Sequence, residues 1–517
     1  MLFPWGRWRI KGQDADTAPA LPVKNTPWPI PPVSSDHFTV EAFKTVIDQI
    51  AKSSGVSWVW VDVGCIDQRR DDPKSGFINT QAPIEIGRQA AVFKRAKSTF
   101  VWLCRLSNAK LTAAVADVQQ HGLDFSDYIL GPNRGQRIPD PLAESLRKAF
   151  DDIFSDPWFS SLWTLQEVVL RNDALVFSTD GTPVLWAEGQ RMFLTMFINH
   201  CQNVYRDLEK ALAQKQTSSS SSSWVVSEAA ASAIHRIKQQ ILQAGFYYLF
   251  STNPNVQYGT ARYRTTTRPE DRIYAIMQIY NIVVGKSVRP DENPQLDELV
   301  PEFAAAINNA SAILGQYFVH TQKPGSGASW QITEQSIIPD ALMVYRDPVN
   351  LATITLATLD FDGGENGQGQ AVAVAKGMVC SFPDLLKASQ EDGRRNPSFA
   401  RQGLGLDFEA FLDHHVPGRD TFQYPLGGPG GIIVDYEKKV QVLHLGHLRG
   451  LPKKPPSGEF HRRHVGLLLH SRTGREGAKG QESVAFERLG VCIWSDRSSN
   501  DLLEKIEWRG VERMVLE

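Results

Sequence analysis

The chain has 517 residues, with 55 basic and 57 acidic side chains and a formal net charge of -2. This balance excludes the strong positive field with which nucleic-acid-binding and anionic-membrane-binding proteins attract their partners. The length exceeds what a single hydrophobic core usually organises, so we expect roughly two to four domains.

Cysteine usage and hydropathy favour a cytoplasmic protein. The five cysteines are far apart and mostly lie in apolar runs, unlike a disulfide framework or a metal knuckle. A reducing compartment fits this usage best. The N-terminus, MLFPWGRWRIKG, lacks the apolar region of a signal peptide. No run approaches the ~18 apolar residues that cross a bilayer, so we expect no membrane span.

The first elements along the chain indicate a βαβ unit. Apolar residues at helical spacing predict a helix over residues 39–53. The run SWVWVDVGCID at 57–67 is almost uninterruptedly apolar and β-branched or aromatic, which predicts a strand covered on both faces of a parallel sheet. A helix over 84–97 and a second buried strand at 98–106 follow.

The stretch DPWFSSLWTLQEVVL, residues 156–170, predicts a half-buried helix. It opens with Asp156 followed by proline, a pair typical of a helix start. One apolar row runs along the helix, and the neighbouring row carries Trp163, Gln166 and Glu167. The Glu167 carboxylate on such a half-buried helix requires a structural or functional explanation.

The rest of the chain divides into two predicted domains. Residues 1–285 form an α/β domain that includes a strand at 174–178, with insertions near 107–141 and 200–245. The second insertion contains a six-serine run, which is typical of a linker or surface loop. Residues 286–517 hold one further helix and then glycine-rich sequence with short β-like runs, which predicts a strand-rich α+β domain.

Two His-x-x-His pairs in the second domain, His444 with His447 and His461 with His464, resemble zinc-ligand spacing. However, alternation along a strand sends positions three apart to opposite faces, and no cysteine is near. We therefore predict no metal site.

Three separated blocks resemble the fungal heterokaryon-incompatibility (HET) domain. They are WVWVDVGCIDQ with the following IEIGRQAAVFKRAKSTFVWL, then DPWFSSLWTLQEVVL, then RPEDRIYAIMQI. Two departures accompany the match. Ser161 stands where the second block usually has arginine, and the family's opening strand is represented only by LFPWG at residues 2–6.

The resemblance implies a flavodoxin-like α/β fold, with a parallel sheet covered by helices on both faces, related to Toll/interleukin-receptor (TIR) domains. Some TIR domains cleave the nicotinamide–ribose bond of NAD with one glutamate, and they commonly work as assemblies. HET-domain proteins trigger cell death when genetically unlike hyphae fuse. NAD would then be a substrate, and no cofactor is required.

Ligands of an open parallel sheet bind outside the carboxyl ends of its strands. Candidate residues at this rim follow the strand at 57–67 or end the shortened first strand, and they are Asp62, Cys65, Asp67, Gln68, Trp5 and Gly6.

The likeness to NAD-cleaving TIR domains makes Glu167 the candidate catalytic residue. Glycosidic cleavage passes through an oxocarbenium-like transition state, whose charge a nearby carboxylate stabilises. Nicotinamide departs neutral, so no general acid is required. Gln166 would be a polar neighbour and Trp163 a stacking surface, while Arg268 would hold a phosphate and Asp271 would orient Arg268.

The same residues also have structural interpretations, which stay open. Glu167 can pair with a basic group and fix its helix, and the aspartates can cap loops or a helix N-terminus. Arg268 can tie down a loop, Trp163 can belong to the core, and Cys65 can be a small buried residue.

The predicted function is an incompatibility or immune-type cell-death effector whose HET domain binds, and as an enzyme would hydrolyse, NAD or a related nucleotide. The alternative is a non-catalytic signalling adaptor that acts by protein–protein contacts and oligomerisation. A nucleoside-processing transferase of similar fold is a third class.

Overall fold

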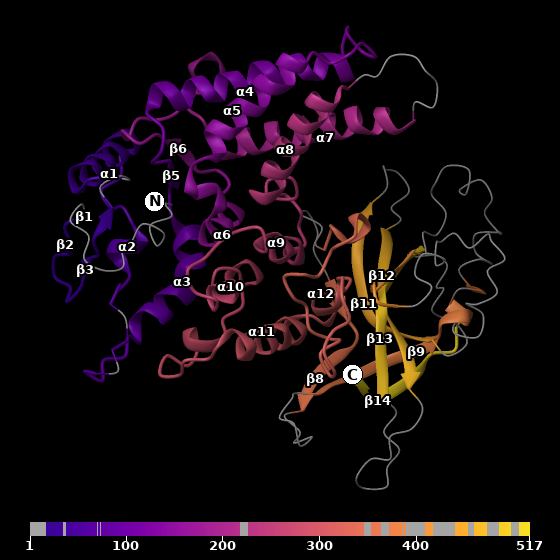
Figure 1. The fold of residues 1–517 in the computed structure, drawn as a ribbon. Helices are drawn as coiled ribbons and strands as arrows, with labels where there is room; N and C mark the ends of the chain where they lie inside the picture. The colour runs from indigo at the N-terminus through magenta and orange to yellow at the C-terminus, as the bar shows by residue number, and fades with distance from the viewer. Residues whose placement is uncertain are drawn as a thin grey trace. The chain divides into compact units, whose positions relative to one another are not determined.

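The computed structural model describes residues 17–34, 38–69, 71–72, 74–217, 226–345, 353–362, 372–385, 387–388, 409–416, 440–452, 460–472, 485–497 and 506–516 (Figure 1). The chain divides into two compact units. Unit 1 comprises Met1–Phe250 with Thr260–Leu296, and unit 2 comprises Ser251–Gly259 with Asp297–Glu517.

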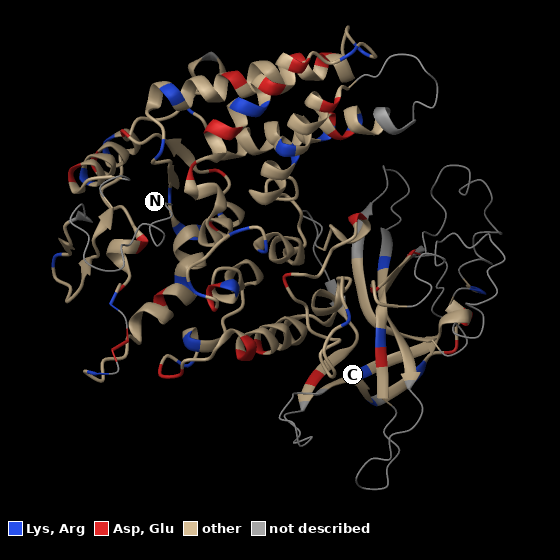
Figure 2. Ribbon diagram, in the orientation of Figure 1, with Lys and Arg blue, Asp and Glu red and all other residues tan. Residues whose placement is uncertain are grey.

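Unit 1 is mainly helical. Its helices are α1 (Val40–Ser54), α2 (Asp62–Cys65), α3 (Gln81–Arg95), α4 (Asn108–Ile129), α5 (Asp140–Phe154), α6 (Leu162–Leu170), α7 (Leu194–Thr217), α8 (Glu228–Gln243) and α10 (Asp271–Tyr274). Short 3-10 helices are η2 (Pro157–Ser160), η3 (Ala187–Gly189), η4 (Met277–Tyr280) and η5 (Gly285–Ser287). Figure 2 shows acidic and basic positions interspersed along these helices, in keeping with the balanced net charge.

Short strands complete unit 1. Two antiparallel pairs join β1 (Thr17–Ala18) to β4 (Val33–Ser34) and β2 (Leu21–Pro22) to β3 (Pro29–Ile30). The parallel pair is β5 (Phe100–Trp102) with β6 (Leu175–Phe177). The strands predicted at 98–106 and 174–178 are therefore confirmed. Both belong to one hydrophobic core, which they share with α1.

The prediction of a strand at 57–67 was wrong. The parallel sheet of unit 1 has only two strands among the described residues. Trp58 is 92% exposed, so the apolar run is not covered on both faces. The Asp62 side chain accepts a hydrogen bond from the Val63 backbone at 2.8 Å, and the Cys65 amide donates to the Val61 carbonyl at 2.8 Å. These local bonds turn the chain into α2 at the position where a strand would have continued.

The helix predicted over 156–170 is divided at Ser161 into η2 and α6. Asp156 caps the first part by accepting from the Trp158 amide at 2.9 Å, as the Asp-Pro pair predicted. Ser161 has an extended backbone and forms a parallel bridge with Thr265. The break therefore ties α6 to the segment that precedes the third block.

The segments predicted as insertions fold largely as helices. The long helix α4 packs against α5 and α7, and α8 packs against α5 and α7 (Figure 1). The six-serine run lies outside the described residues. None of the described helices has the length and apolar character needed to cross a bilayer.

Unit 2 carries a large sheet beside a few helices. The helices are α9 (Pro254–Ala261), which begins in this unit, α11 (Leu296–Ala310), α12 (Ala312–Gln316) and η6 (Asp340–Leu342). The strands are β7 (Thr353–Thr355), β8 (Thr358–Asp362), β9 (Val372–Ser381), β10 (Glu409–Leu412), β11 (Val440–Pro452), β12 (Phe460–Arg472), β13 (Ala485–Arg497) and β14 (Arg509–Leu516). Their order is β7-β11-β12-β13-β14-β9-β8, with β10 on β13 and a further β11–β9 pairing. Within this sheet, only the β13–β14 pairing of the described strands is parallel. The prediction of strand-rich structure in the C-terminal part is confirmed.

Candidate functional site

Glu167 lies on the buried side of α6. Its side chain belongs to a residue that is only 8% exposed, and Oε2 has no hydrogen-bond partner among the described residues. Burial raises the pKa of Glu167 well above its ordinary value, and the negative charge of Asp62 raises it further. The positive charge of Arg264 acts in the opposite direction. Glu167 is thus a buried carboxyl group that resists ionisation.

Asp62 begins α2 and supplies the second acid of this site. Burial raises the pKa of Asp62 to about 6, although the hydrogen bond from the Val63 backbone opposes the shift. Because the charge of Asp62 acts on Glu167, the two carboxyl groups are close enough to interact. The fold therefore brings together one predicted residue from the first block and one from the second.

Buried amide side chains join α6, α3 and η4. Gln166 Nε2 donates to Gln89 Oε1 of α3 at 3.2 Å, while Gln166 Oε1 has no partner among the described residues. Gln278 of η4 accepts from the Ala90 amide at 2.9 Å and donates to the Gly87 carbonyl at 2.5 Å. The two glutamines of α3 and η4 escaped sequence reasoning. In each case, the only indication in the sequence was a carboxamide side chain within an otherwise apolar row of a helix.

Arg264 is the buried cation near α6, and sequence reasoning also missed it. Its side chain is fully buried, and Nη1 donates to the Ser161 carbonyl at 2.9 Å and to Thr164 Oγ1 at 2.7 Å. Nη2 donates to the Ala244 carbonyl. These bonds fix the junction between η2 and α6, and the same positive charge partly offsets the burial of Glu167.

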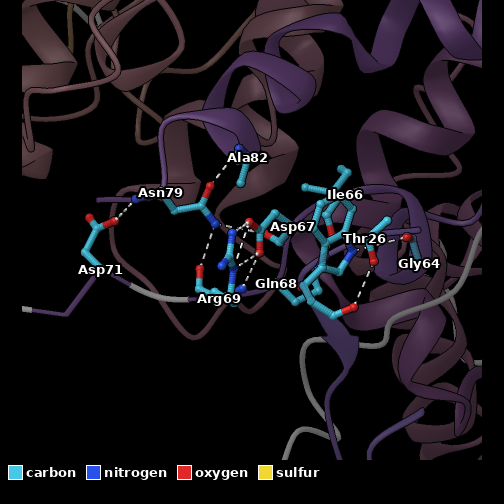
Figure 3. A network of polar contacts seen from close by, with 10 residues as sticks. Thr26, Gly64, Ile66, Asp67, Gln68, Arg69, Asp71, Asn79 and Ala82 are labelled. Carbon is cyan, nitrogen blue, oxygen red and sulfur yellow. Dashed lines mark hydrogen bonds and ion pairs between the residues drawn. The ribbon is translucent and has the colours of Figure 1, made fainter. Parts of the chain in front are cut away.

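Asp67 and Gln68 stabilise the loop after α2 (Figure 3). Asp67 is buried and forms an ion pair with Arg69 at 2.6 Å. Burial alone would raise the pKa of Asp67, but the hydrogen bonds and charge of Arg69 bring it below its ordinary value. Asn79 Nδ2 donates to the Asp67 carbonyl at 3.1 Å, and Gln68 Nε2 donates to the Ile66 carbonyl at 3.1 Å. The negative charge of Asp67 is therefore compensated by Arg69.

Asp271 joins the second and third blocks. Its carboxylate accepts from Thr266 Oγ1 at 2.6 Å and from the Trp163 side chain. Burial raises the pKa of Asp271, whereas these two hydrogen bonds and the charge of Arg268 lower it. Arg268 is exposed, and its charge also lowers the pKa of Asp71. Arg268 is therefore on the surface, and its charge acts both on Asp71 in the loop after α2 and on Asp271.

Three further candidates add little to this site. Cys65 is exposed as a residue, but partial desolvation of its thiol together with the charge of Asp62 raises the pKa of Cys65, so the thiol stays protonated. Trp5 and Gly6 lie outside the described residues. No group of three or more His, Cys, Asp or Glu side chains able to hold a metal occurs in the described part of the chain.

Comparison with known proteins gives one match. Residues 5–167 match the family model described as Heterokaryon incompatibility protein (HET). Searches of curated proteins and of solved structures found no match. The matched segment contains α2, α3, β5 and most of α6 and ends at Glu167, whereas Arg264 and Asp271 lie beyond it.

Proposed function

We propose, because residues 5–167 match the HET family model, that the protein has a role related to heterokaryon incompatibility as an immune-type cell-death effector that binds NAD or a related nucleotide and hydrolyses it. The proposal includes a TIR-like reaction in which the bond between nicotinamide and ribose is cleaved. It places the protein in the cytoplasm and makes self-association its means of activation.

The observation that carries this proposal is the acid pair of Glu167, which is buried, and Asp62, which is half-buried. A buried carboxyl group without a hydrogen-bond partner costs about 1–3 kcal/mol, so a protein rarely keeps one without use. Glu167 Oε2 is such an atom among the described residues. Perturbed pKa values that result from burial and from a second acid are typical of functional sites.

The proposed cleavage depends on the charges of the nicotinamide ring and of Glu167. The nicotinamide ring of NAD is cationic, so its approach favours the ionised form of Glu167 that burial otherwise suppresses. The C1′–N bond breaks with its electron pair going to the ring nitrogen, which leaves nicotinamide neutral. The carboxylate stabilises the oxocarbenium-like ribose, water adds to C1′, and the proton that this water releases passes to an ionised carboxylate of the pair.

The neighbouring groups have matching roles in this proposal. Gln166 Oε1 would accept a hydrogen bond from a ribose hydroxyl, and the exposed Arg268 would contact a phosphate. Trp163 would border the site with its ring while its side chain donates to Asp271.

The contacts of Arg264 favour the adaptor as a second candidate. A structural glutamate is expected to be buried near a cation, and Glu167 is buried with the charge of Arg264 acting on it. Asp67 is held by Arg69 in the loop after α2. In this alternative the polar residues stabilise the domain, and the protein signals by contacts and oligomerisation.

NAD turnover by purified full-length protein at high concentration distinguishes the two functions. We expect nicotinamide release by the wild type and at least a hundredfold loss, about 2.7 kcal/mol of transition-state stabilisation, in Glu167→Gln. Glu41→Gln is the matched control, because it makes the same chemical change at an exposed position of the same domain.

Circular dichroism must show that both variants keep the wild-type fold. Equal activity in Glu167→Gln and Glu41→Gln would contradict a catalytic role for Glu167. Light scattering establishes whether the wild type is dispersed or assembled. If neither form released nicotinamide, the adaptor would be the function that remains.

A further inference from the structure

Two histidines of unit 2 form a hydrogen-bonded pair inside the large sheet. His444 Nε2 lies 3.1 Å from His464 Nδ1, and both side chains are buried. The register explains the contact, because His464 is paired with His447 and His444 with Gly466. A register shift between His444 and Gly446 of β11 places both β11 histidines on the face of His464. The expectation from simple alternation, that His444 and His447 face opposite ways, was therefore wrong.

Two indole rings pack on this histidine pair. Trp494 is the cross-strand partner of His464 and stacks on it with ring centroids 5.3 Å apart and an interplanar angle of 11°. Trp508 contacts His444 with centroids 5.3 Å apart. The Nε1 atoms of Trp494 and Trp508 are buried and have no hydrogen-bond partner among the described residues. The cluster thus contains two donors that only an acceptor can satisfy.

Gly466 provides the space for these rings. A Cβ atom at Gly466 would lie 2.5 Å from Val442 Cγ1, 2.9 Å from Trp494 Cζ3 and 3.0 Å from Cys492 Sγ. Trp494 is 1% exposed, whereas Trp508 is only partly buried and packs at the border of the same core. The cluster is therefore buried at Trp494 and only partly buried at Trp508 and at His447, whose ring lies 5.4 Å from that of His464.

The charges around the pair disfavour a proton on it. Burial lowers the pKa of His444 to about 4, the charge of His447 lowers it too, and a hydrogen bond with the Gly446 backbone opposes the shift. Burial raises the pKa of the Cys380 and Cys492 thiols in the same core, and the charge of Asp384 adds to the shift at Cys380. None of the groups that shift the pKa of His444 is a carboxylate. An arriving anion would supply the negative charge that a protonated imidazole needs.

We propose that His444, His464, Trp494 and Trp508 form a binding site for a small monovalent anion, with a carboxylate as the matching chemical class. Its two oxygens accept from the two indole N–H groups and from the imidazole pair, which takes up one proton from solvent. The binding therefore couples anion affinity to pH. This site lies in unit 2 and does not depend on the reaction proposed for Glu167.

The test uses the full-length protein with ¹⁵N-labelled tryptophan, titrated with sodium formate at constant ionic strength. We expect formate to shift the indole N–H signals of Trp494 and Trp508, which Trp494→Phe and Trp508→Phe assign. Because binding takes up a proton, the affinity should rise about tenfold per pH unit between pH 7 and 6.

Trp330 is the matched control within unit 2. It is also fully buried, but its Nε1 donates to the Gly327 carbonyl at 2.8 Å, so formate should leave its signal unmoved. Formamide, which is neutral and of similar size, should not bind with this pH dependence. The proposal is overturned if formate shifts no signal, if Trp330 shifts as much as Trp494, or if formamide reproduces the effect. Titration of the wild-type protein gives this answer even if a variant fails to fold.

Discussion

The ion pair between Arg488 and Asp413 is the most consequential buried interaction of unit 2. Both side chains are fully buried, and Arg488 Nη1 donates to the two carboxylate oxygens at 3.0 and 2.9 Å. Arg488 Nη2 donates to the Phe318 carbonyl at 2.6 Å, and Asp413 Oδ1 also accepts from the His320 amide at 2.8 Å. The pair therefore fastens β13, the end of β10 and the segment after α12 to one another.

Asp413→Ala leaves the guanidinium of Arg488 buried without its counter-charge. Removing one partner of a buried pair typically costs about 3–5 kcal/mol, because the remaining charge is uncompensated. Since a domain is stable by only about 5–15 kcal/mol, we expect unit 2 to lose a large part of its stability. Replacing both partners, as Asp413→Ala with Arg488→Met, removes the stranded charge. The double variant should then be more stable than Asp413→Ala alone.

Urea unfolding of the two single variants and the double variant measures this coupling, which we expect to exceed about 2 kcal/mol. Glu85→Ala is the control, because its ion pair with Arg88 is exposed and should contribute less than about 1 kcal/mol. A cost below about 1 kcal/mol for Asp413→Ala, or additive effects in the double variant, would refute the reasoning.

Two further predictions concern the stability of unit 2. Burial lowers the pKa of His320 and of His444 to about 4, so the unfolded chain binds more protons between pH 6.5 and 4. The contribution of each buried neutral histidine to the free energy of unfolding is therefore fully present above pH 6.5. It is lost as pH falls towards 4, by up to ~3 kcal/mol per histidine. Urea unfolding at several pH values checks this, and a flat profile would contradict it. Gly466→Ala should destabilise the protein by about 1–3 kcal/mol through overpacking, and thermal unfolding of Gly466→Ala beside Gly325→Ala, whose Cβ meets nothing closer than 4.0 Å, tests it.

Elements whose apolar pattern matches a buried face were predictable from the sequence. α1 and β5 lie within the ranges predicted for them, apart from one or two residues at a helix end, and β6 falls inside its predicted strand. Each of these segments contributes to one hydrophobic core, so composition and burial agree. The runs of β-like sequence beyond residue 350 likewise form the large, mostly antiparallel sheet.

Features set by a few local or long-range contacts were not predictable. The run at 57–67 has the composition of a buried strand, yet the Asp62 cap and the exposure of Trp58 end it in a helical turn. In β11, one register shift reverses the alternation on which the zinc argument depended. Gln89 contacts Gln166 across 77 positions, a partnership that only the folded chain establishes.

The same limit applies to the site, where position 161 is the clearest example. The resembling family usually has arginine there, and Ser161 in its place removes that positive charge from the start of α6. Instead, the Ser161 carbonyl accepts from Arg264, about a hundred positions away, and the charge of Arg264 lowers the pKa of Glu167. The positive charge that acts on Glu167 therefore belongs to a segment outside the matched residues 5–167. The serine by itself is thus no argument against an ionisable Glu167; burial and the neighbouring Asp62 are what oppose its ionisation.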